Sequence, residues 1–530
     1  MIRFASSSIR SFITSQSTRA NGQVQHDLRR VIAAKAFDHG LRPLDRPTYR
    51  VENGFGAKMR PMRQRRTKIV ATLGPATDAP GVLDALVEAG LDCARLNCSH
   101  GDHDDLRRRA ADVRAASKRA GRALGLLFDL QGPKLRLSGS TEPRSVEVGD
   151  EVTFTTPGNE ASHDRVIVDF EKFPALVTER SEIVIGDGVP RFAVVAEQGD
   201  DVVARAISPG PLAPRKGINV TYARPELPSI TDKDVEDLRL AAELGADFVA
   251  LSFVRSAADI EQLRSLAQEF GSSARLVAKV EKIEAYEALD ELIDVSDGLM
   301  VARGDYGVEA GVARVPLMQK DTIRRATQEG KFVITATQML ESMIQAPEPT
   351  RAEATDVANA VIDGTSAVML SAETSVGAYP VEAVRAMAEI ATAAEESPVI
   401  HGRAVPVVTG STGEAVMRAA VELADELDAA ALIVPSSTGG AARACAKYRR
   451  RRPIIALAHQ PGVADQLTLE WGVFPTNMET AETVDEMVEL ALETARDFAD
   501  LEPGARVVLT AGRRTGTPGA TNLVMVREIP

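Results

Sequence analysis

The segment LLFDLQGPKLRL (126–137) brings a carboxylate and two cations together at the end of an apolar run. Asp129 ends the run, and Lys134 and Arg136 follow it after a Gly-Pro pair. Polar residues of the same kinds stand at or near the ends of other apolar runs. They are Arg95, Asn97 and Ser99 in ARLNCSHG, Lys279 and Glu281 in AKVEKIE, Asp305 in VARGD, and Thr337 in ATQM.

These residue types are the parts that phosphoryl transfer requires. Glu281 and Asp305 offer hard oxygen ligands, and Mg²⁺ usually takes one or two carboxylates from a protein. Arg95, Arg136 and Lys279 offer fixed positive charge for the equatorial oxygens of a phosphoryl group in transit. Taken singly, a charged residue at a strand end is more often solvated or ion-paired than catalytic. The interpretation therefore depends on a fold that gathers these residues at one place.

The elements that must gather them are eight apolar runs that alternate with segments of helical period. Continuous apolar strands separated by helices indicate a parallel sheet covered on both faces, and eight such units predict a closed (β/α)8 TIM barrel. Polar residues at the C-terminal ends of the strands then converge on one mouth, where barrel active sites lie. The predicted strands are 68–74, 93–99, 123–130, 246–253, 275–281, 298–305, 332–339 and 367–373, and helical patterns lie at 103–120, 232–244, 257–270, 316–329 and 353–362.

Two further regions interrupt and follow the barrel, which is assigned to residues 67–138 and 226–398. Residues 139–225 carry alternating β patterns with Gly-Asp and Asp-Gly turns, which predict an inserted β-barrel lid domain on the face where barrel loops carry function. Residues 399–530 are predicted to form a C-terminal α/β regulatory domain. Its predicted strands are 430–435, 453–458, 506–511 and 523–528, with a long helix at 481–499.

The charge of the chain is unevenly distributed. Of the net charge of −13, residues 1–66 contribute 14 Lys and Arg against 4 Asp and Glu, so the remaining residues are strongly acidic. An acidic body disfavours nucleic-acid binding, and an anionic substrate would need a local cationic pocket or a metal ion. The three cysteines show no disulfide or zinc spacing, and no apolar segment is long enough to cross a membrane.

The N-terminal extension, residues 1–66, carries no recognisable chemistry. Its first twenty residues contain six Ser, three Arg and no acidic residue, which is typical of an organellar transit peptide. A disordered tail or an over-long start is the alternative, and it is favoured by the bacterial-like composition of the rest of the chain. We therefore expect a cytoplasmic protein, with an organellar location as the alternative.

Long segments of the chain closely resemble pyruvate kinase, over residues 67–529. The resemblance implies transfer of the phosphoryl group of phosphoenolpyruvate to ADP, giving ATP and pyruvate, which is the last step of glycolysis. It also implies a homotetramer. The matching segments are TKIVATLGPAT (67–77), ARLNCSHG (94–101), DGLMVARGDYGVE (297–309), ATQMLESMIQAPEPTRAEATDVANAVIDG (336–364), MLSAETSVGAYPVEAV (369–384) and GTPGATN (516–522).

The resemblance also implies roles for individual residues. Glu281 and Asp305 would hold the divalent metal, Mg²⁺ or Mn²⁺. Lys279 would lie against the phosphoryl group, and Arg95 would clamp the phosphate. Thr337 would position the enol for protonation, while the proton donor stays open because it can be a water molecule. Gly304 and Ser371 would complete the substrate site, and the nucleotide site would comprise Pro75, Asn97, His100, Arg136 and Lys216, the last carried by the closing lid.

The segment DLQGPKLR (129–136) differs from its counterpart in many members of the family, which read Asp-Thr-Lys-Gly-Pro-Glu-Ile-Arg. Those members hold a potassium ion beside the phosphate. Lys134 replaces the glutamate, and an ammonium beside Asp129 and the phosphate would supply the charge of that ion. We therefore expect activity with Mg²⁺ and without potassium. The alternative is that Lys134 turns to solvent and potassium still binds. The residues that correspond to the potassium site are Asn97, Ser99, Asp129, Leu130 and Lys134.

The C-terminal region contains a loop, PSSTGGAARA (435–444), that suits a phosphorylated ligand. Such a loop before a helix can bind phosphate through backbone N–H groups, and this region of the family binds an effector. Gly440 stands where several regulated members have Arg, so fructose 1,6-bisphosphate is not expected. A simple turn with a helix cap is the alternative. The effector loop would comprise Ser436, Ser437, Thr438, Gly439 and Gly440.

Two other functions compete with phosphoryl transfer to ADP. The first is a barrel lyase or aldolase that acts on pyruvate or phosphoenolpyruvate with Mg²⁺, which would need neither the inserted domain nor the GTPGATN segment. The second is a non-catalytic paralogue with a regulatory role. Such a paralogue would be free to lose Arg95, Lys279, Glu281 or Asp305, and all four are present.

Overall fold

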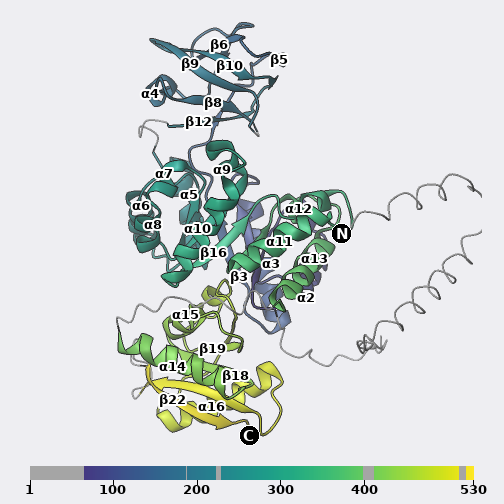
Figure 1. Cartoon of the computed structure of the whole chain (residues 1–530), viewed down its shortest axis with the longest axis vertical. Coiled ribbons are helices and arrows are strands. Elements are labelled where there is room, and N and C mark those ends of the chain that lie inside the picture. The colour runs from purple at the N-terminus through teal and green to yellow at the C-terminus, as the bar shows by residue number, and fades with distance from the viewer. Residues whose placement is uncertain (1–64, 187, 223–227, 398–410, 513–520) are drawn as a thin grey trace, which may run out of the picture. The chain divides into compact units, whose positions relative to one another are not determined.

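A computed structural model describes residues 65–186, 188–222, 228–397, 411–512 and 521–530 (Figure 1). The predicted N-terminal extension lies outside the described residues except for Arg65 and Arg66. Most of the GTPGATN segment also lies outside them. No helix in the described part of the chain is both long enough and apolar enough to span a membrane.

Eight parallel strands close into the predicted barrel, and the order around it is β1-β17-β16-β15-β14-β13-β3-β2. Each strand is only four to six residues long and almost entirely buried, because helices cover its outer face and side chains fill the interior. The strands are β1 (Lys68–Thr72), β2 (Cys93–Asn97), β3 (Gly125–Asp129), β13 (Phe248–Leu251), β14 (Arg275–Val280), β15 (Gly298–Ala302), β16 (Phe332–Ala336) and β17 (Ala367–Leu370).

The helices of the barrel begin at identifiable caps. Asp102 accepts a hydrogen bond from the backbone N–H of Asp105 at the start of α3, and Thr231 and Thr350 cap α5 and α11 in capping boxes. The barrel helices are α2 (Val82–Ala89), α3 (His103–Ala120), α5 (Asp232–Glu243), α6 (Ala257–Glu269), α7 (Ile283–Glu287), α8 (Leu289–Val295), α9 (Arg303–Ala310), α10 (Val315–Gln328), α11 (Arg351–Asp363), α12 (Ala372–Ser375) and α13 (Pro380–Glu395), with 3-10 turns η2 (Pro75–Thr77) and η3 (Glu341–Ile344).

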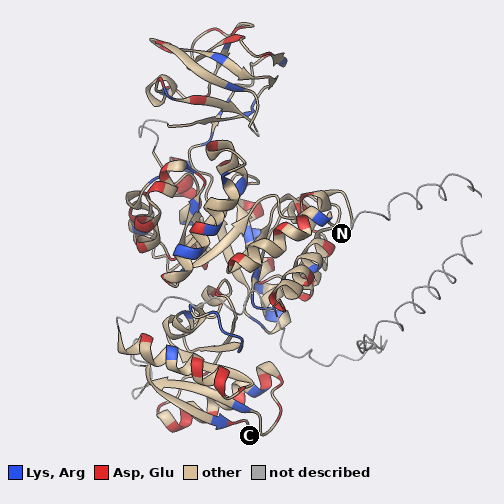
Figure 2. Ribbon diagram, viewed as in Figure 1, with Lys and Arg blue, Asp and Glu red and all other residues tan. Residues whose placement is uncertain are grey.

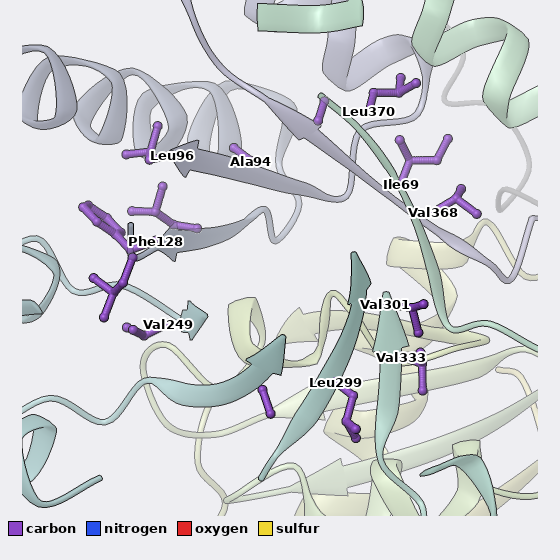
Figure 3. Close-up of a cluster of buried hydrophobic side chains, with 14 of the residues drawn as sticks. Ile69, Ala94, Leu96, Phe128, Val249, Leu299, Val301, Val333, Val368 and Leu370 are labelled. Atoms are coloured by element: carbon purple, nitrogen blue, oxygen red, sulfur yellow. The ribbon is translucent and has the colours of Figure 1, made fainter. Parts of the chain in front are cut away.

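The core of the barrel has two layers, because alternate residues of a strand point to opposite faces. Leu299 and Val301 of β15 point outward and pack with other strand residues against the helices (Figure 3). Met300 between them points inward, where it packs with Val277 and Phe332. The polar residues that follow the last inward apolar residue of each strand are thereby carried to the C-terminal mouth.

Several predicted strands are longer than the observed ones at their C-terminal ends. Asp305 does not close a strand; it lies in the first turn of α9, which begins at Arg303. Ser99 lies in the turn after β2, and Thr337 follows β16 with φ 68°. The reason is that parallel strands of the barrel run only as far as the apolar interior, whereas the polar residues beyond it bond to loops and helix termini.

The inserted region forms a seven-stranded sheet in the order β4-β12-β8-β9-β10-β6-β7, with a second sheet of β11 and β5. Its core contains Phe154, Phe173 and Phe192, all fully buried. The boundaries 139–225 stay a prediction, and the sheet's first strand starts at Leu135. Its elements are β4 (Leu135–Arg136), β5 (Arg144–Val146), β6 (Glu151–Thr155), β7 (Arg165–Ile167), α4 (Phe173–Leu176), β8 (Glu182–Ile185), β9 (Arg191–Gln198), β10 (Asp201–Ser208), β11 (Gly210–Leu212) and β12 (Gly217–Val220).

The C-terminal domain is a five-stranded sheet in the order β20-β19-β18-β21-β22, with helices beside it. Four of its strands match the predicted ones, and β20 is an additional strand. β22 runs antiparallel to β21, while the other pairs are parallel. The elements are α14 (Thr412–Glu426), β18 (Ala431–Ser436), α15 (Gly440–Ala446), β19 (Ile454–Ala458), η5 (Asp465–Leu467), β20 (Val473–Asn477), α16 (Val484–Ala499), β21 (Arg506–Gly512) and β22 (Thr521–Glu528).

The loop before β20 closes the N-terminal end of the barrel. Leu469 packs into the inward-facing core, and Glu470 forms a buried ion pair of 2.7 Å with Arg275 at the start of β14. Lys68, at the start of β1, donates a hydrogen bond of 2.5 Å to the carbonyl of Val473, and its ammonium lies 4.4 Å from the ring centre of Phe474. Burial lowers the pKa of Lys68 to about 8.

The pKa of Lys68 predicts a stability that changes with pH. Its usual pKa is 10.5, so between about pH 8 and 10.5 the unfolded chain binds a proton that the folded chain does not. Below pH 8 the folded chain bears the full cost of the buried charge, on the order of 3 kcal/mol, and the cost disappears as the pH rises to 10.5. Lys68→Met removes this charge. We therefore expect its thermal midpoint, relative to that of the parent, to be highest near pH 7 and to decline toward pH 10.

The control for this measurement is Lys118→Met, which changes an exposed lysine on α3. Its midpoint, relative to that of the parent, should stay level across the same pH range. A Lys68→Met difference that stays constant or grows with pH would contradict the prediction.

Candidate active site

A cluster of opposite charges lies at the C-terminal mouth of the barrel. The carboxylate of Asp129, 1% exposed at the end of β3, bonds to Arg95 of β2, with 2.7 Å from Oδ2 to both Nε and NH2. Its other oxygen lies 3.2 Å from the Nζ of Lys279 on β14. A second hydrogen bond, from NH1 of Arg95 to the hydroxyl of Thr72 on β1, fixes the guanidinium. Four strands thus hold the two cations.

The ammonium of Lys279 has two further oxygens beside it. It donates a hydrogen bond of 2.6 Å to the hydroxyl of Ser252, which follows β13. Its Nζ lies 3.6 Å from Oε2 of Glu281, which follows β14. The other oxygen of Glu281 accepts a hydrogen bond of 2.6 Å from the backbone N–H of Phe253. Lys279 and Glu281 therefore meet at the mouth, as the sequence predicted.

Burial and neighbouring charges set the ionisation of this cluster. Burial is the largest cause that raises the pKa of Glu281 to about 7; Asp305 adds to the rise, and Lys279 opposes it. Burial also acts against the charge of Asp129, but the charges and hydrogen bonds of Lys279 and Arg95 hold its pKa below the usual value. For Lys279, the carboxylates of Asp129 and Glu281 outweigh burial and raise its pKa. Asp129 and Lys279 are therefore both charged near neutral pH.

Glu281 and Asp305 have the features of a site for one divalent ion. Oε2 of Glu281 is buried and has no hydrogen-bond partner among the described residues. Asp305 is exposed in the first turn of α9, close enough to Glu281 to affect its pKa. No group of three or more such ligands occurs in the part of the chain that the structure describes. Two carboxylates fit Mg²⁺, which takes its remaining ligands from substrate and water.

Gly304 and Thr337 are joined directly at the rim of the mouth, just after the neighbouring strands β15 and β16. The backbone N–H of Gly304, which precedes Asp305, donates a hydrogen bond of 2.8 Å to the hydroxyl of Thr337. Ser371 caps α12 at the end of β17, and its hydroxyl is buried without a hydrogen-bond partner among the described residues. Its backbone N–H instead donates to Glu373. The hydroxyl of Ser371 is thus available to a bound ligand.

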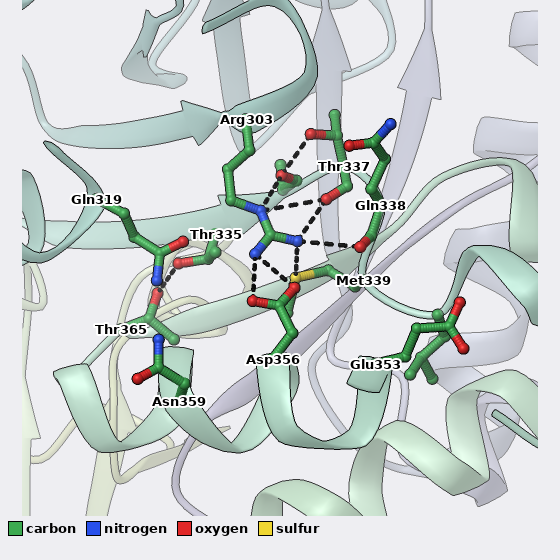
Figure 4. A network of polar contacts seen from close by, with 12 residues as sticks. Arg303, Gln319, Thr335, Thr337, Gln338, Met339, Glu353, Asp356, Asn359 and Thr365 are labelled. Carbon is green, nitrogen blue, oxygen red and sulfur yellow. Dashed lines mark hydrogen bonds and ion pairs between the residues drawn. The ribbon is translucent and has the colours of Figure 1, made fainter. Parts of the chain in front are cut away.

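Arg303 supports the turn that carries Thr337 (Figure 4). Thr337 and Gln338 both have left-handed backbone angles, φ 68° and 53°, which are costly for residues other than glycine. The guanidinium of Arg303 donates hydrogen bonds to the carbonyls of Thr337 and Gln338, at 2.6 and 3.2 Å, and forms an ion pair of 2.6 Å with Asp356. These bonds fix an otherwise strained turn beside Gly304.

A cationic cavity of about 310 Å³ lies beside the charge cluster, between the barrel and the inserted sheet. Acidic and basic residues are mixed along the helices of the barrel (Figure 2), and the chain as a whole is acidic, so this local concentration of cations stands out. Arg136 and Lys216 come from the inserted side, and Asp305 comes from the barrel. The cations that line the cavity are Lys134, Arg136, Arg215, Lys216, Arg255 and Lys282.

Lys134 does not lie against Asp129 as the sequence led us to expect. It is exposed on the wall of the cationic cavity, and the ion pairs of Asp129 in the described chain are with Arg95 and Lys279. Two cations already neutralise Asp129, so a third has no electrostatic reason to approach it. The carbonyl of Leu130 accepts a hydrogen bond of 2.6 Å from Ser252.

The remaining residues of the predicted nucleotide site lie near the mouth, on the loops after β1 and β2. Pro75 is exposed at the start of η2, and Asn97 ends β2 and accepts a hydrogen bond from the backbone N–H of Ser99. His100 is exposed in the next turn. Burial is the largest cause that lowers the pKa of His100, and the charges of Lys134, Arg136 and Arg95 lower it further. His100 therefore lies within the electrostatic reach of the cationic cavity.

The predicted effector loop lines a second cavity, of about 880 Å³, in the C-terminal domain. Gly439 has φ 76°, a conformation that suits glycine, and the carbonyl of Thr438 accepts a hydrogen bond from Arg443. The helix that follows, α15, is only seven residues long. The cavity is also lined by Arg443, which offers positive charge to an anion, and by Lys447, which forms an ion pair of 2.8 Å with Glu414.

Three residues of the site were not singled out from the sequence. Thr72 and Ser252 are polar residues at or after strand ends, in KIVAT and VALSF, so the rule that found Lys279 applies to them too. Their short hydroxyls carry no charge and gave no signal of chemistry. Arg303 precedes Gly304 in VARGD, but only the fold shows that it braces a turn 34 residues away.

A parallel barrel with a buried amine, two carboxylates and a cationic cavity at its C-terminal mouth defines an enzyme that transfers a phosphoryl group. Two family models match the chain: the pyruvate kinase barrel domain over residues 64–384, and the pyruvate kinase alpha/beta domain over residues 414–527. The chain belongs to the pyruvate kinase family, and it is a phosphotransferase with pyruvate kinase function.

Individual relatives agree with the family models. The pyruvate kinase of Mycobacterium tuberculosis is 42% identical over 469 residues, which cover 88% of this chain and 98% of that protein. The pyruvate kinase of Geobacillus stearothermophilus is 39% identical over 478 residues, covering 88% and 81%. The crystal structure of a pyruvate kinase from Cryptosporidium parvum matches with a TM-score of 0.82 at 33% identity, covering 88% of this chain and 97% of that one.

Proposed function

We propose that the mouth of the barrel binds phosphoenolpyruvate against Arg95 and Lys279 and transfers its phosphoryl group to ADP. The observation that carries this proposal is the buried ammonium of Lys279, which is held between Asp129, Ser252 and Glu281 at the C-terminal mouth of the barrel. A pair of fixed cations in a water-poor site stabilises the charge of a migrating phosphoryl group far better than mobile cations in water. The products are ATP and pyruvate.

Lys279 and Arg95 have different roles in this proposal. Arg95 is fixed by Asp129 and Thr72, so its guanidinium is a rigid clamp for the phosphate of phosphoenolpyruvate. Lys279 is a compact charge held by Asp129, Ser252 and Glu281, and it lies against the phosphoryl group as this group moves from donor to acceptor. Asp129 keeps both cations charged and oriented, and it does not touch the substrate.

Glu281 and Asp305 hold the divalent cation of the reaction, Mg²⁺ or Mn²⁺. When bound, this ion supplies Lewis-acid charge for the substrate oxygens. Support comes from the buried Oε2 of Glu281, which accepts no hydrogen bond among the described residues and lies 3.6 Å from the Nζ of Lys279. Burial and the charge of Asp305 raise the pKa of Glu281 to about 7, and a bound divalent cation would offset both effects. Gly304 and Thr337 position the three-carbon part of the substrate. The hydroxyl of Ser371 lies on the same side, and the proton donor can be a water molecule.

The cationic cavity binds the phosphates of the nucleotide. Arg136 and Lys216 belong to the inserted domain, and Asn97, Pro75 and His100 border the mouth from the barrel side. Closure of the inserted domain over the mouth would bring Lys216 to the phosphates and exclude water, which protects the substrate from hydrolysis. The inserted domain therefore acts as a lid.

The activity is tested with purified protein in an ADP-dependent assay coupled to lactate dehydrogenase. We expect phosphoenolpyruvate to yield pyruvate when Mg²⁺ is present, and kcat to vanish when the metal is chelated. Lys279→Met should lower kcat on the order of 10²–10³-fold, the typical cost of a lost donor to a developing charge. Lys331→Met, which removes a half-buried lysine at the other end of the barrel, is the control and should keep kcat near that of the parent.

Two results would contradict this proposal. One is a Lys279→Met variant as fast as the parent, which would remove the amine from the reaction. The other is release of pyruvate from phosphoenolpyruvate at the same rate without ADP, since a lyase or phosphatase needs no acceptor nucleotide.

We also propose that the reaction needs no potassium ion, because Lys134 supplies positive charge at the mouth. Its stem is long and its ammonium is exposed on the cavity wall, from which it can reach a bound phosphate. A glutamate at this position would differ by two units of charge, and each unit is worth roughly 4 kcal/mol at ~4 Å with an effective dielectric constant of about 20. The other residues that correspond to the potassium site, Asn97, Ser99, Asp129 and Leu130, lie at or just after the ends of β2 and β3.

Lys134→Glu should make the enzyme dependent on potassium. In buffer free of sodium and potassium, we expect the parent to be active and the variant to lose activity on the order of tenfold or more, with recovery on addition of potassium chloride. Lys118→Glu, an exposed change on α3, serves as the control. A parent enzyme that is inactive until potassium is added would show that Lys134 turns to solvent and that the ion still binds.

We make three broader proposals. The effector loop, Ser436 to Gly440, binds a phosphorylated effector in the second cavity, where Arg443 offers positive charge. The protein is a homotetramer, which would cover the exposed apolar side chains of Val312, Leu317 and Val376. It acts in the cytoplasm, as a glycolytic enzyme without a membrane-spanning helix in its described part.

A further inference from the structure

The turn that follows β13 contacts both Lys279 and Glu281. Ser252, the first residue after β13, is 3% exposed, and its hydroxyl accepts the hydrogen bond of 2.6 Å from the Nζ of Lys279. Phe253, the next residue, donates its backbone N–H to Glu281. Two consecutive residues thus hold the amine and one of the carboxylates of the site.

The hydrogen bonds of Ser252 have a definite direction. A hydroxyl has one proton to donate, and the carbonyl of Leu130 at 2.6 Å is its nearest acceptor, with Asp129 Oδ1 at 3.4 Å. The oxygen lone pairs of Ser252 are therefore directed toward the ammonium of Lys279. A chain of hydrogen bonds runs from Lys279 through Ser252 to the backbone of Leu130, so a fixed main-chain group sets the direction of the amine.

Ser252 differs from the other partners of Lys279 because it is neutral. The carboxylates of Asp129 and Glu281, at 3.2 and 3.6 Å from Nζ, attract the ammonium and also cancel part of its charge. The hydroxyl of Ser252 directs the ammonium without cancelling any charge. If the hydroxyl were absent, the ammonium would move toward the two carboxylates, and less of its field would reach a phosphoryl group.

The backbone of this turn is strained and closely packed. Phe253 has φ 56°, a left-handed conformation that is costly for a residue other than glycine. Gly132 packs against it so closely that a Cβ at Gly132 would lie 2.9 Å from the ring of Phe253 and 3.1 Å from Cβ of Ser252. Such backbone strain persists only where the surrounding structure fixes the conformation. Because Ser252 directly precedes Phe253 and packs against the same glycine, the position of its hydroxyl is fixed as well.

We propose that Ser252 is a positioning residue for phosphoryl transfer, which orients the ammonium of Lys279 toward the migrating phosphoryl group through the hydrogen-bond chain to Leu130. This inference rests on the proposed role of Lys279. Ser252 acts on the transition state through Lys279 and does not bind either substrate itself. Its loss should therefore affect kcat and leave KM nearly unchanged.

The test compares Ser252→Ala with a matched control, Ser366→Ala. Ser366 is also a buried serine of the barrel, 1% exposed, and it precedes β17 at the opposite end of the barrel. Its hydroxyl accepts hydrogen bonds from the backbone N–H of Val333 and from the guanidinium of Arg449. We expect Ser252→Ala to lower kcat on the order of tenfold with both KM values within about twofold of the parent. Ser366→Ala should keep kcat near that of the parent. Thermal midpoints measured on both variants identify any loss of kcat that comes from unfolding.

A double-mutant cycle with Lys279→Met shows whether Ser252 acts through the amine. In the Lys279→Met background, Ser252→Ala should lower kcat by less than twofold, because the group that it positions is already absent. A full tenfold loss in that background would show that Ser252 acts independently of Lys279, and the inference would be wrong.

The outcomes separate this inference from the proposed role of Lys279. A Lys279→Met variant with the kcat of the parent would overturn the role of the amine, and this inference with it. A strongly impaired Lys279→Met variant together with a Ser252→Ala variant as fast as Ser366→Ala would overturn this inference alone. A rise in the KM for phosphoenolpyruvate as the main effect of Ser252→Ala would also overturn it, since Ser252 would then contribute to binding.

Discussion

The site depends on one buried cluster of charges, in which Asp129 is bonded to Arg95 and Lys279, and Lys279 also lies 3.6 Å from Glu281. Burying a charged group is costly unless it is paired, so Asp129 is what allows two cations to remain charged in a water-poor mouth. The raised pKa of Glu281, about 7, has a different cause, because burial and the nearby charge of Asp305 outweigh the attraction of Lys279. The same buried cluster therefore sets the ionisation of Asp129, Lys279 and Glu281.

The fold maintains this cluster because the groups come from different parallel strands that end together. The C-terminal parts of β2, β3 and β14 carry Arg95, Asp129 and Lys279. The apolar interior of the barrel lies below these residues and keeps water away from them on that side. Glu281 is fixed by the backbone of the turn after β13. No single loop could place these charges, since each would relax toward its nearest opposite charge. The inserted sheet then adds a cationic wall for phosphates without disturbing the buried group.

Sequence reasoning found the (β/α)8 barrel, a further β domain and the C-terminal α/β domain, because apolar runs and turn pairs leave clear patterns. The roles of the charged residues at the strand ends stay a prediction. Sequence reasoning did not find what depends on three-dimensional packing. Asp305 was expected to end a strand but lies in a helix, and Lys134 was expected beside Asp129 but is exposed on the cavity wall. Ser252 and Arg303 act by orienting other groups, and a hydroxyl or a guanidinium whose partner lies tens of residues away has no signature in the sequence alone.

We propose that Lys279, Glu281 and Asp305 meet around one divalent ion and the substrate. Crystals grown with Mn²⁺ and pyruvate, measured at a wavelength where manganese scatters anomalously, test this arrangement most directly. We expect one strong anomalous peak in contact with the carboxylates of both Glu281 and Asp305, with pyruvate beside Thr337 and the Nζ of Lys279 facing the same space. A manganese peak at any other place, or a Lys279 side chain directed away from the ion and the pyruvate, would contradict it.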